Sequence, residues 1–214
     1  MISIRKIIKR GRRRLRRIDP RVLGVVWLLA LAVACSALYS NTMPRYINPT
    51  AYAPLLETIA EGESNGNYNA YYGQPANTSI KLTEMTIAQL LQWQRDYVRA
   101  GNPSSAAGRY QIIQPTLEGL VRELAINQSD VFNEQLQDRM AIALAERRGA
   151  RDFIENDISA DQFAANLAQE WAALPAVTGS RPTESFYAGD GLNVARVSVD
   201  ATLDAVREFK RLAN

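Results

Sequence analysis

One uncharged apolar run, from Val22 to Tyr39, constrains this chain more than any other feature. As a helix its 18 residues would rise about 27 Å, close to the roughly 30 Å hydrocarbon core of a bilayer. Residues 1–21 contain ten Lys or Arg against a single Asp, whereas Ser-Asn-Thr-Met-Pro follows the run. By the positive-inside rule, this asymmetry predicts a single-pass transmembrane helix with a cytoplasmic N-terminus and an exported remainder.

A cleaved signal peptide is the main alternative to this anchor. Ala32-Val33-Ala34 has the A-x-A pattern of a cleavage site, and Cys35 follows it. We favour an uncleaved anchor. The expected organisation is a basic cytoplasmic tail (1–21), a transmembrane anchor (22–39), a linker (40–51) and an exported domain (52–214).

The net charge of +3 averages two very different parts, because residues 1–21 carry +9 and the rest of the chain carries −6. The basic tail could contact nucleic acid or anionic lipid. Beside a membrane span, topology is a sufficient explanation, so we expect the lipid bilayer as a partner and no nucleic acid.

The chain contains no histidine, and its single cysteine lies within the apolar run. These two facts exclude a Ser-His-Asp triad, a Cys-His dyad and every histidine-containing zinc site. Catalysis would have to come from carboxylates, hydroxyls, amides, Lys or Arg. No acidic cluster has the spacing of a calcium loop, and we expect no metal and no cofactor.

The exported domain has mainly helical signals and is predicted to be mainly α (α+β). Residues 64–80 are rich in Asn, Gly and Tyr and predict a loop or a small β element. Capping boxes begin at Thr86 and Ser159. The helices are expected from Pro54 to about Glu63, from Thr86 to before Gly101, from Pro115 to about Leu124, over 133–148, from Ser159 to before Pro175, and from about Val199 to Leu212.

Glu63 is the carboxylate whose position best suits chemistry. Leu56, Ile59 and Glu63 have the spacing i, i+3, i+7, which places the carboxyl on an apolar helix face. A desolvated carboxyl keeps its proton near neutral pH and can give it to a leaving oxygen. On spacing alone, however, a solvated glutamate at a helix end is the stronger interpretation.

Three stretches of the exported domain change that balance. The chain resembles the lambda-type phage lysozymes in three stretches: IAEGESNGNYNAYYG (Ile59–Gly73), SSAAGRYQII (Ser104–Ile113) and QDRMAIALAERRGARDFIENDIS (Gln137–Ser159). The third stretch is followed by EWAALPA, which agrees with the resemblance. These lysozymes are lytic transglycosylases of the lysozyme-like superfamily, and the likeness covers roughly residues 52–212. The chain is also similar to the soluble lytic transglycosylases at their three motifs, which correspond to Glu63-Ser64, Gly108–Gln111 and Ser185–Gly189.

The resemblance implies a lysozyme-like helical domain with Glu63 as the catalytic acid. Its implied substrate-binding residues are Ser64, Tyr72, Tyr110, Gln111 and Tyr187. Gln111 would bind an N-acetyl or hydroxyl group of a sugar, with Tyr110 beside it in the cleft. Tyr187 would lie near Glu63, and Tyr72 would offer a flat face for a sugar ring.

A hydrolysing lysozyme needs a second carboxylate, as nucleophile or as base for a water. None stands out, because Glu61 should point to another side of the helix and nothing fixes Asp190 near Glu63. A single acid suffices when the sugar's own 6-hydroxyl attacks the anomeric carbon. We therefore expect a lytic transglycosylase that acts on peptidoglycan glycan strands, with a hydrolytic muramidase as the alternative.

Several biological settings fit such a chain. It could be a virion protein that opens the wall during infection, an endolysin whose anchor leaves the membrane, or a bacterial enzyme that works with secretion-machine proteins. The first two predict a catalytic domain in the periplasm, tethered to the host inner membrane or a virion membrane. A catalytically silent murein-binding or structural membrane protein on the same fold is a further alternative.

Overall fold

Seven α-helices and two 3-10 helices build the part of the chain that the computed structural model describes, residues 46–214. They are η2 (Pro49–Tyr52), α2 (Ala53–Ser64), η3 (Leu82–Glu84), α3 (Ile87–Arg99), α4 (Gln114–Glu123), α5 (Glu134–Arg147), α6 (Ala150–Ile154), α7 (Ala160–Ala168) and α8 (Val199–Ala213). The mainly helical prediction is therefore confirmed. Within this described part no helix combines the length and apolarity that crossing a bilayer requires. The predicted anchor at 22–39 lies outside the described residues.

The helices begin where their sequence signals place them. The Thr86 hydroxyl accepts a hydrogen bond from the N–H of Gln89, and the Gln89 side-chain oxygen accepts one from the N–H of Thr86, so the predicted capping box opens α3. Pro54 stands in the first turn of α2, where the missing N–H costs nothing. This helix ends at Asn65, which has a left-handed backbone with φ of 52°. The local chemistry therefore fixes both ends of the helix that carries Glu63.

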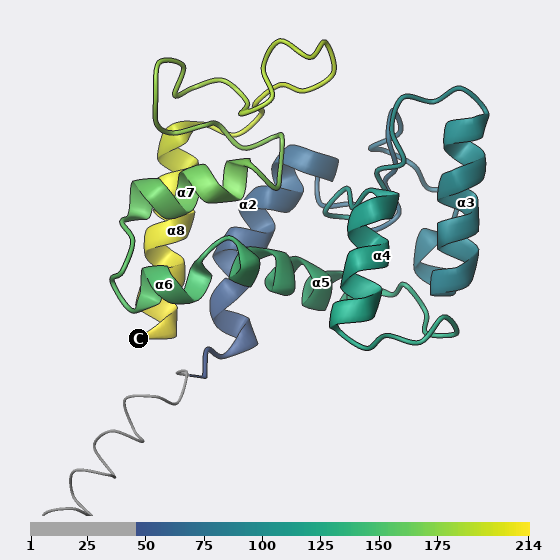
Figure 1. Cartoon of the computed structure of the whole chain (residues 1–214), viewed down its shortest axis with the longest axis horizontal. Helices are drawn as coiled ribbons and strands as arrows, with labels where there is room; N and C mark the ends of the chain where they lie inside the picture. The colour runs from purple at the N-terminus through teal and green to yellow at the C-terminus, as the bar shows by residue number, and fades with distance from the viewer. Residues whose placement is uncertain (1–45) are drawn as a thin grey trace, which may run out of the picture. The chain divides into compact units, whose positions relative to one another are not determined.

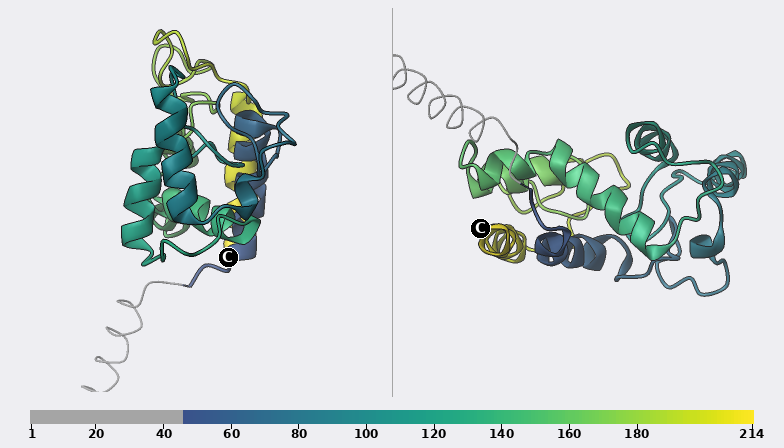
Figure 2. Two further views of the ribbon diagram at one scale, coloured as in Figure 1. Left: turned by 90° about the vertical axis from the view of Figure 1, so that its right-hand side faces the viewer. Right: turned by 90° about the horizontal axis from the view of Figure 1, so that it is seen from below.

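The helices form two neighbouring groups (Figures 1 and 2). In the larger group α2 packs along α8, and α7 and α6 cover α8. In the smaller group α3 packs against α4. The centre of the larger group is aromatic: ring centroids 4.6–6.5 Å apart join Tyr52, Phe153, Phe163 and Phe209. Burying such a ring stabilises the fold by about 1.5–3 kcal/mol.

The small β element expected near residues 67–80 is reduced to isolated bridges, and residues 46–214 contain no strand. Tyr71 pairs with Gln74 and with Ala107. Side-chain amides bind backbone carbonyls that a neighbouring strand would otherwise bind: Asn77 donates to the carbonyls of Asn69 (2.6 Å) and Ile80 (2.7 Å). A loop held by asparagines satisfies its backbone without a sheet.

The helix expected to continue from Ser159 to before Pro175 ends early, at Ala168. Its N-cap is as predicted, because Ser159 accepts a hydrogen bond from the N–H of Gln162. The reciprocal half of the capping box is absent, since the Gln162 side chain donates to Asn166 instead. The early end leaves residues 169–174 as turns, and these turns form one wall of the site.

Candidate active site

Glu63 is the penultimate residue of α2 and lines a cleft of about 780 Å³. Leu56 and Ile59, on the same helix face, are buried beneath it as the spacing predicts. The cleft brings together all six site residues that the sequence suggested: Glu63, Ser64, Tyr72, Tyr110, Gln111 and Tyr187. Co-location supports these assignments, but their individual roles stay predictions.

The two carboxyl oxygens of Glu63 have different surroundings. Oε1 accepts a hydrogen bond of 3.0 Å from the main-chain N–H of Ala173, whereas Oε2 has no hydrogen-bond partner among the described residues. Burial raises the pKa of Glu63 from its ordinary 4.5 to about 7. The Ala173 N–H and the positive charge of Arg196 oppose that rise in pKa. Glu63 therefore retains its proton to a higher pH than an exposed glutamate does, and Oε2 is the oxygen without a competing hydrogen-bond partner among the described residues.

The early end of α7 supplies the Ala173 N–H. In a continuous helix this N–H would bond to the carbonyl of Gln169, four residues before it. Because the helix has already ended, the N–H binds Glu63, and the Gln169 carbonyl accepts a bond of 2.7 Å from the Tyr187 hydroxyl. The N–H of Ala173 and the carbonyl of Gln169, which would bond to each other in a longer helix, therefore bond to two residues of the cleft instead.

Close packing at Gly62 brings α2 to this turn. A Cβ at Gly62 would lie 2.9 Å from the Cβ of Ala173 and 2.8 Å from Cγ2 of Val197, both closer than real contacts. Only a glycine lets the helix approach this far. The hydrogen bond between Ala173 and Glu63 depends on that approach.

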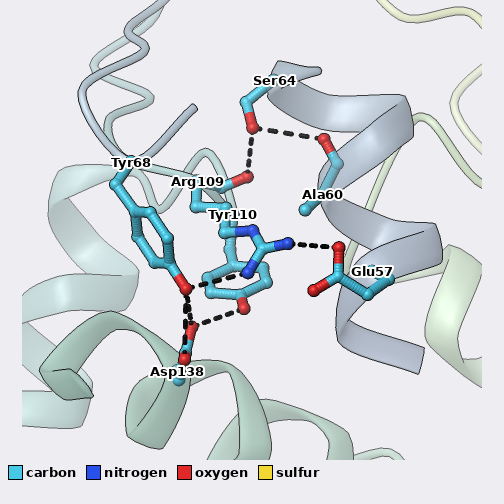
Figure 3. A network of polar contacts seen from close by, with 7 residues as sticks. All are labelled: Glu57, Ala60, Ser64, Tyr68, Arg109, Tyr110 and Asp138. Carbon is cyan, nitrogen blue, oxygen red and sulfur yellow. Dashed lines mark hydrogen bonds and ion pairs between the residues drawn. The ribbon is translucent and has the colours of Figure 1, made fainter. Parts of the chain in front are cut away.

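Ser64 lines the cleft but is 1% exposed, and its hydroxyl is already used. It donates to the carbonyl of Arg109 at 2.7 Å and to that of Ala60 at 3.2 Å (Figure 3). The geometry therefore gives Ser64 a positioning role. It fastens the residue after the candidate acid to the 108–111 turn, which carries Gln111.

A polar network behind the cleft holds the same turn (Figure 3). The guanidinium of Arg109 donates to Glu57 at 2.5 Å and to the Tyr68 hydroxyl at 2.8 Å. Asp138 accepts hydrogen bonds from the hydroxyls of both Tyr68 (2.9 Å) and Tyr110 (2.6 Å). Tyr110 is 1% exposed, so it supports the cleft wall with its ring and directs its hydroxyl away from a substrate.

The turn itself is built on left-handed backbone. Gly108 has φ of 81°, and a Cβ there would lie 2.4 Å from Oε1 of Gln137, which accepts a bond from the Arg109 N–H. Gln111 has φ of 47°, unusual for a residue with a side chain. Its amide nitrogen donates to the Gly108 carbonyl at 2.8 Å. This bond orients the amide of Gln111 at the cleft.

Aromatic rings form another wall of the cleft. Tyr71 and Tyr72 both line it and are partly exposed. Tyr71 packs edge-on against Trp93 and Tyr97, with ring centroids 5.2 and 5.4 Å apart. The Tyr97 hydroxyl donates to the Tyr72 carbonyl at 2.8 Å. The Tyr71 ring and the main chain of Tyr72 are therefore held in place, and both rings are of the flat kind that sugar rings stack on.

The remaining wall comes from residues 176–197, which we call the strap, the long loop before α8 (Figure 1). Tyr187 lies on it, 40% exposed and fixed through its hydroxyl to Gln169. Leu192 and Val194, 49% and 58% exposed, also line the cleft. The strap therefore adds an apolar and aromatic rim beside the candidate acid.

The carboxylates near Glu63 are not free to assist it. Glu61 is exposed and lies outside the cleft lining. Asp190 also lies outside it and accepts hydrogen bonds from the N–H groups of Leu192 and Asn193. Glu170 does line the cleft, but it forms an ion pair of 2.8 Å with Arg148. Among residues 46–214, Glu63 is thus the one unpaired carboxyl on the cleft.

Sequence reasoning missed four residues of this site. The Ala173 N–H has no side-chain signal, and it is free only because α7 ends early. Glu170 with Arg148 is an ion pair between residues distant in sequence. Arg196 stands alone in an unpatterned stretch, so only the fold shows that it lines the cleft with Glu63.

Comparison with known proteins gives one family. The family model described as Endolysin matches residues 53–188, which run from the start of α2 into the strap. No curated protein and no solved structure matches the chain. The matched residues include every sequence-predicted site residue of the cleft.

Proposed function

Because this chain belongs to the Endolysin family, and so is a phage enzyme that degrades peptidoglycan, we propose that it works as a lytic transglycosylase with Glu63 as its acid and base. The observation that carries the proposal is that Glu63 is the single unpaired carboxyl on the cleft among residues 46–214. Cleavage of the β-1,4 bond between N-acetylmuramic acid and N-acetylglucosamine needs a proton for the leaving oxygen. The raised pKa of Glu63, about 7, suits a group that both gives and takes a proton near neutrality.

The reaction runs in two proton transfers. Glu63 gives its Oε2 proton to the glycosidic oxygen as the bond from that oxygen to C1 of the muramyl sugar breaks. The 6-hydroxyl of the same sugar then bonds to C1, and its proton passes to the Glu63 carboxylate. The products are a free 4-hydroxyl on N-acetylglucosamine and a 1,6-anhydro-muramyl end. No water is consumed, and Glu63 returns to its starting state.

The remaining cleft residues bind and orient the strand in this proposal. Tyr72 stacks on a sugar ring, and the amide of Gln111 bonds to an N-acetyl or hydroxyl group. Tyr187 lies beside the sugar next to Glu63. Ser64 and Tyr110 keep the wall in place from behind, through Arg109 and Asp138.

The test uses the full-length chain and Glu63→Gln on purified peptidoglycan in ¹⁸O-labelled water, with products identified by mass spectrometry. We expect anhydro ends without ¹⁸O from the wild type, and a rate reduced by at least about a hundredfold in the variant. Reducing ends that contain ¹⁸O would make the enzyme a hydrolytic muramidase. No release by a folded wild type would point to a silent wall-binding protein.

The proposal extends to location. The apolar run at 22–39 would hold the enzyme in the host inner membrane, with the basic tail cytoplasmic and the cleft periplasmic. Endolysin membership favours host lysis as the biological setting. Protease added to intact spheroplasts should remove the catalytic domain and leave the tail protected. Complete protection of the chain would contradict this topology.

A further inference from the structure

Arg196 and Glu63 are linked by hydrogen bonds to the same residue, Ala173. The main-chain N–H of Arg196 donates to the Ala173 carbonyl at 2.8 Å, while the Ala173 N–H donates to Glu63 at 3.0 Å. Its guanidinium Nη1 lies 3.5 Å from the carbonyl oxygen of Gly62, the residue before Glu63. The strap and the end of α2 are therefore linked at the candidate acid, by main chain and by side chain.

Arg196 is also the uncompensated charge on the cleft. It lines the cleft and forms no ion pair with a described carboxylate, whereas Arg148 is paired with Glu170. The other titratable side chains lining the cleft are phenols, those of Tyr71, Tyr72, Tyr110 and Tyr187. Its position beside the last turn of α2 also suits a cation, because helix C-termini carry partial negative charge.

We propose that Arg196 is a positioning residue of the reaction, which holds the end of α2 and stabilises the Glu63 carboxylate once its proton has passed to the leaving oxygen. This inference rests on the proposed function. The proton transfer creates a negative charge where the neutral acid stood, and an unpaired cation nearby favours that change. Arg196 acts through Glu63 and touches no reacting atom.

The strength of the attraction between Arg196 and the Glu63 carboxylate depends on how much water surrounds the two groups. Arg196 is exposed to solvent, so water screens its attraction for the carboxylate. A bound glycan strand displaces that water and lowers the local dielectric, which strengthens the attraction. The influence of Arg196 should therefore be larger in the enzyme–substrate complex than in the free enzyme.

The test compares full-length Arg196→Gln and Arg196→Lys with the wild type. Arg181→Gln is the matched control, because Arg181 lies on the same strap outside the cleft lining, exposed and paired with Glu184. The rate on soluble glycan strands is measured against pH, and the Glu63 carboxyl is titrated by ¹³C NMR in the unliganded protein. Glu63→Gln identifies its resonance.

Loss of the positive charge raises the pKa of Glu63, so the acid keeps its proton to higher pH. In Arg196→Gln we expect the alkaline limb of kcat/KM and the NMR midpoint to move up by about half a pH unit. The limb of kcat should move further, and the maximal kcat should fall about tenfold. Arg196→Lys should restore most of both, and Arg181→Gln should match the wild type.

Two results would overturn the inference. The first is an unchanged NMR midpoint in Arg196→Gln. The second is a rate lowered equally at every pH, which would leave Arg196 only a structural role. If the wild type releases nothing from glycan strands, the proposed function fails, while the NMR titration still decides whether Arg196 acts on Glu63.

Discussion

Ser64 donates a hydrogen bond of 2.7 Å to the carbonyl oxygen of Arg109, and this bond joins the helix of the candidate acid to the turn of Gln111. Two residues that are 45 positions apart in sequence thereby fix the position of Glu63, the candidate acid, relative to the amide of Gln111. The bond is buried, so no water can replace it without rearrangement.

Ser64→Ala tests that link. The Arg109 carbonyl would lose its partner in a buried position, at a cost of about 1–3 kcal/mol in the free energy of unfolding. We expect kcat on glycan strands to fall about tenfold, because Gln111 shifts relative to Glu63. Chemical denaturation and steady-state rates measure the two effects. Ser180→Ala, on the exposed strap, should change neither; equal rates in both variants would remove the positioning role of Ser64.

The raised pKa of Glu63 makes stability depend on pH. The unfolded chain releases this proton near pH 4.5, whereas the folded chain retains it to about pH 7. The folded state therefore binds the extra proton in this window, and its stability falls as pH rises through it, by about 3 kcal/mol. Glu63→Gln should flatten this part of the profile and be more stable than the wild type at pH 8. Parallel profiles for both proteins would show an ordinary pKa for Glu63.

Gly108 offers a second test of the turn. A methyl group at this position would collide with the Gln137 side chain and with the ring of Phe132, 2.9 Å away, at a left-handed φ of 81°. Gly108→Ala should cost at least about 3 kcal/mol and abolish cleavage, as measured by thermal unfolding and release of muropeptides. Gly179→Ala is the control, because Gly179 has φ of 84° but open space around it. Its cost should be about 1–2 kcal/mol, with activity kept.

Glu170→Gln separates the two glycosidase mechanisms. If Glu63 acts alone, loss of the Glu170 charge only frees Arg148 and should lower the rate by less than about fivefold. A hydrolase that uses Glu170 as base or nucleophile would instead lose at least about a hundredfold. Product analysis on the same peptidoglycan, with Glu63→Gln in parallel, gives the answer.

Local signals predicted the helices well and the site only in part. The capping box at Thr86 and the proline at 54 mark helix starts by chemistry that lies within a few residues, so α3 and α2 begin where expected. The end of α7 had no such mark. Pro175 suggested a later end, but tertiary bonds from Glu63 and Tyr187 to the 169–173 turn compete with the last helical turn.

The loop at residues 64–80 is a second case in which tertiary contacts could not be predicted from local sequence. The abundance of Asn, Gly and Tyr in this segment predicted a loop or a small β element, and the fold forms a loop whose backbone is satisfied by the side chains of Asn67, Asn69 and Asn77. Which amide reaches which carbonyl depends on three-dimensional contacts. The position of Arg196 in the cleft could not be predicted either, because Arg196 comes close to Glu63 only when the strap folds back against α2.

The pairing of α2 with α8 has a consequence for synthesis. The candidate acid lies on the first α-helix of the unit Ile47–Asn214, and the helix packed along it is the last. A ribosome therefore makes the helix of Glu63 well before its main packing partner. Until Phe209 has left the ribosome, Tyr52 lacks the ring that it packs against. A nascent chain that stops before α8 lacks this packing, and we expect activity to begin only once α8 has been made.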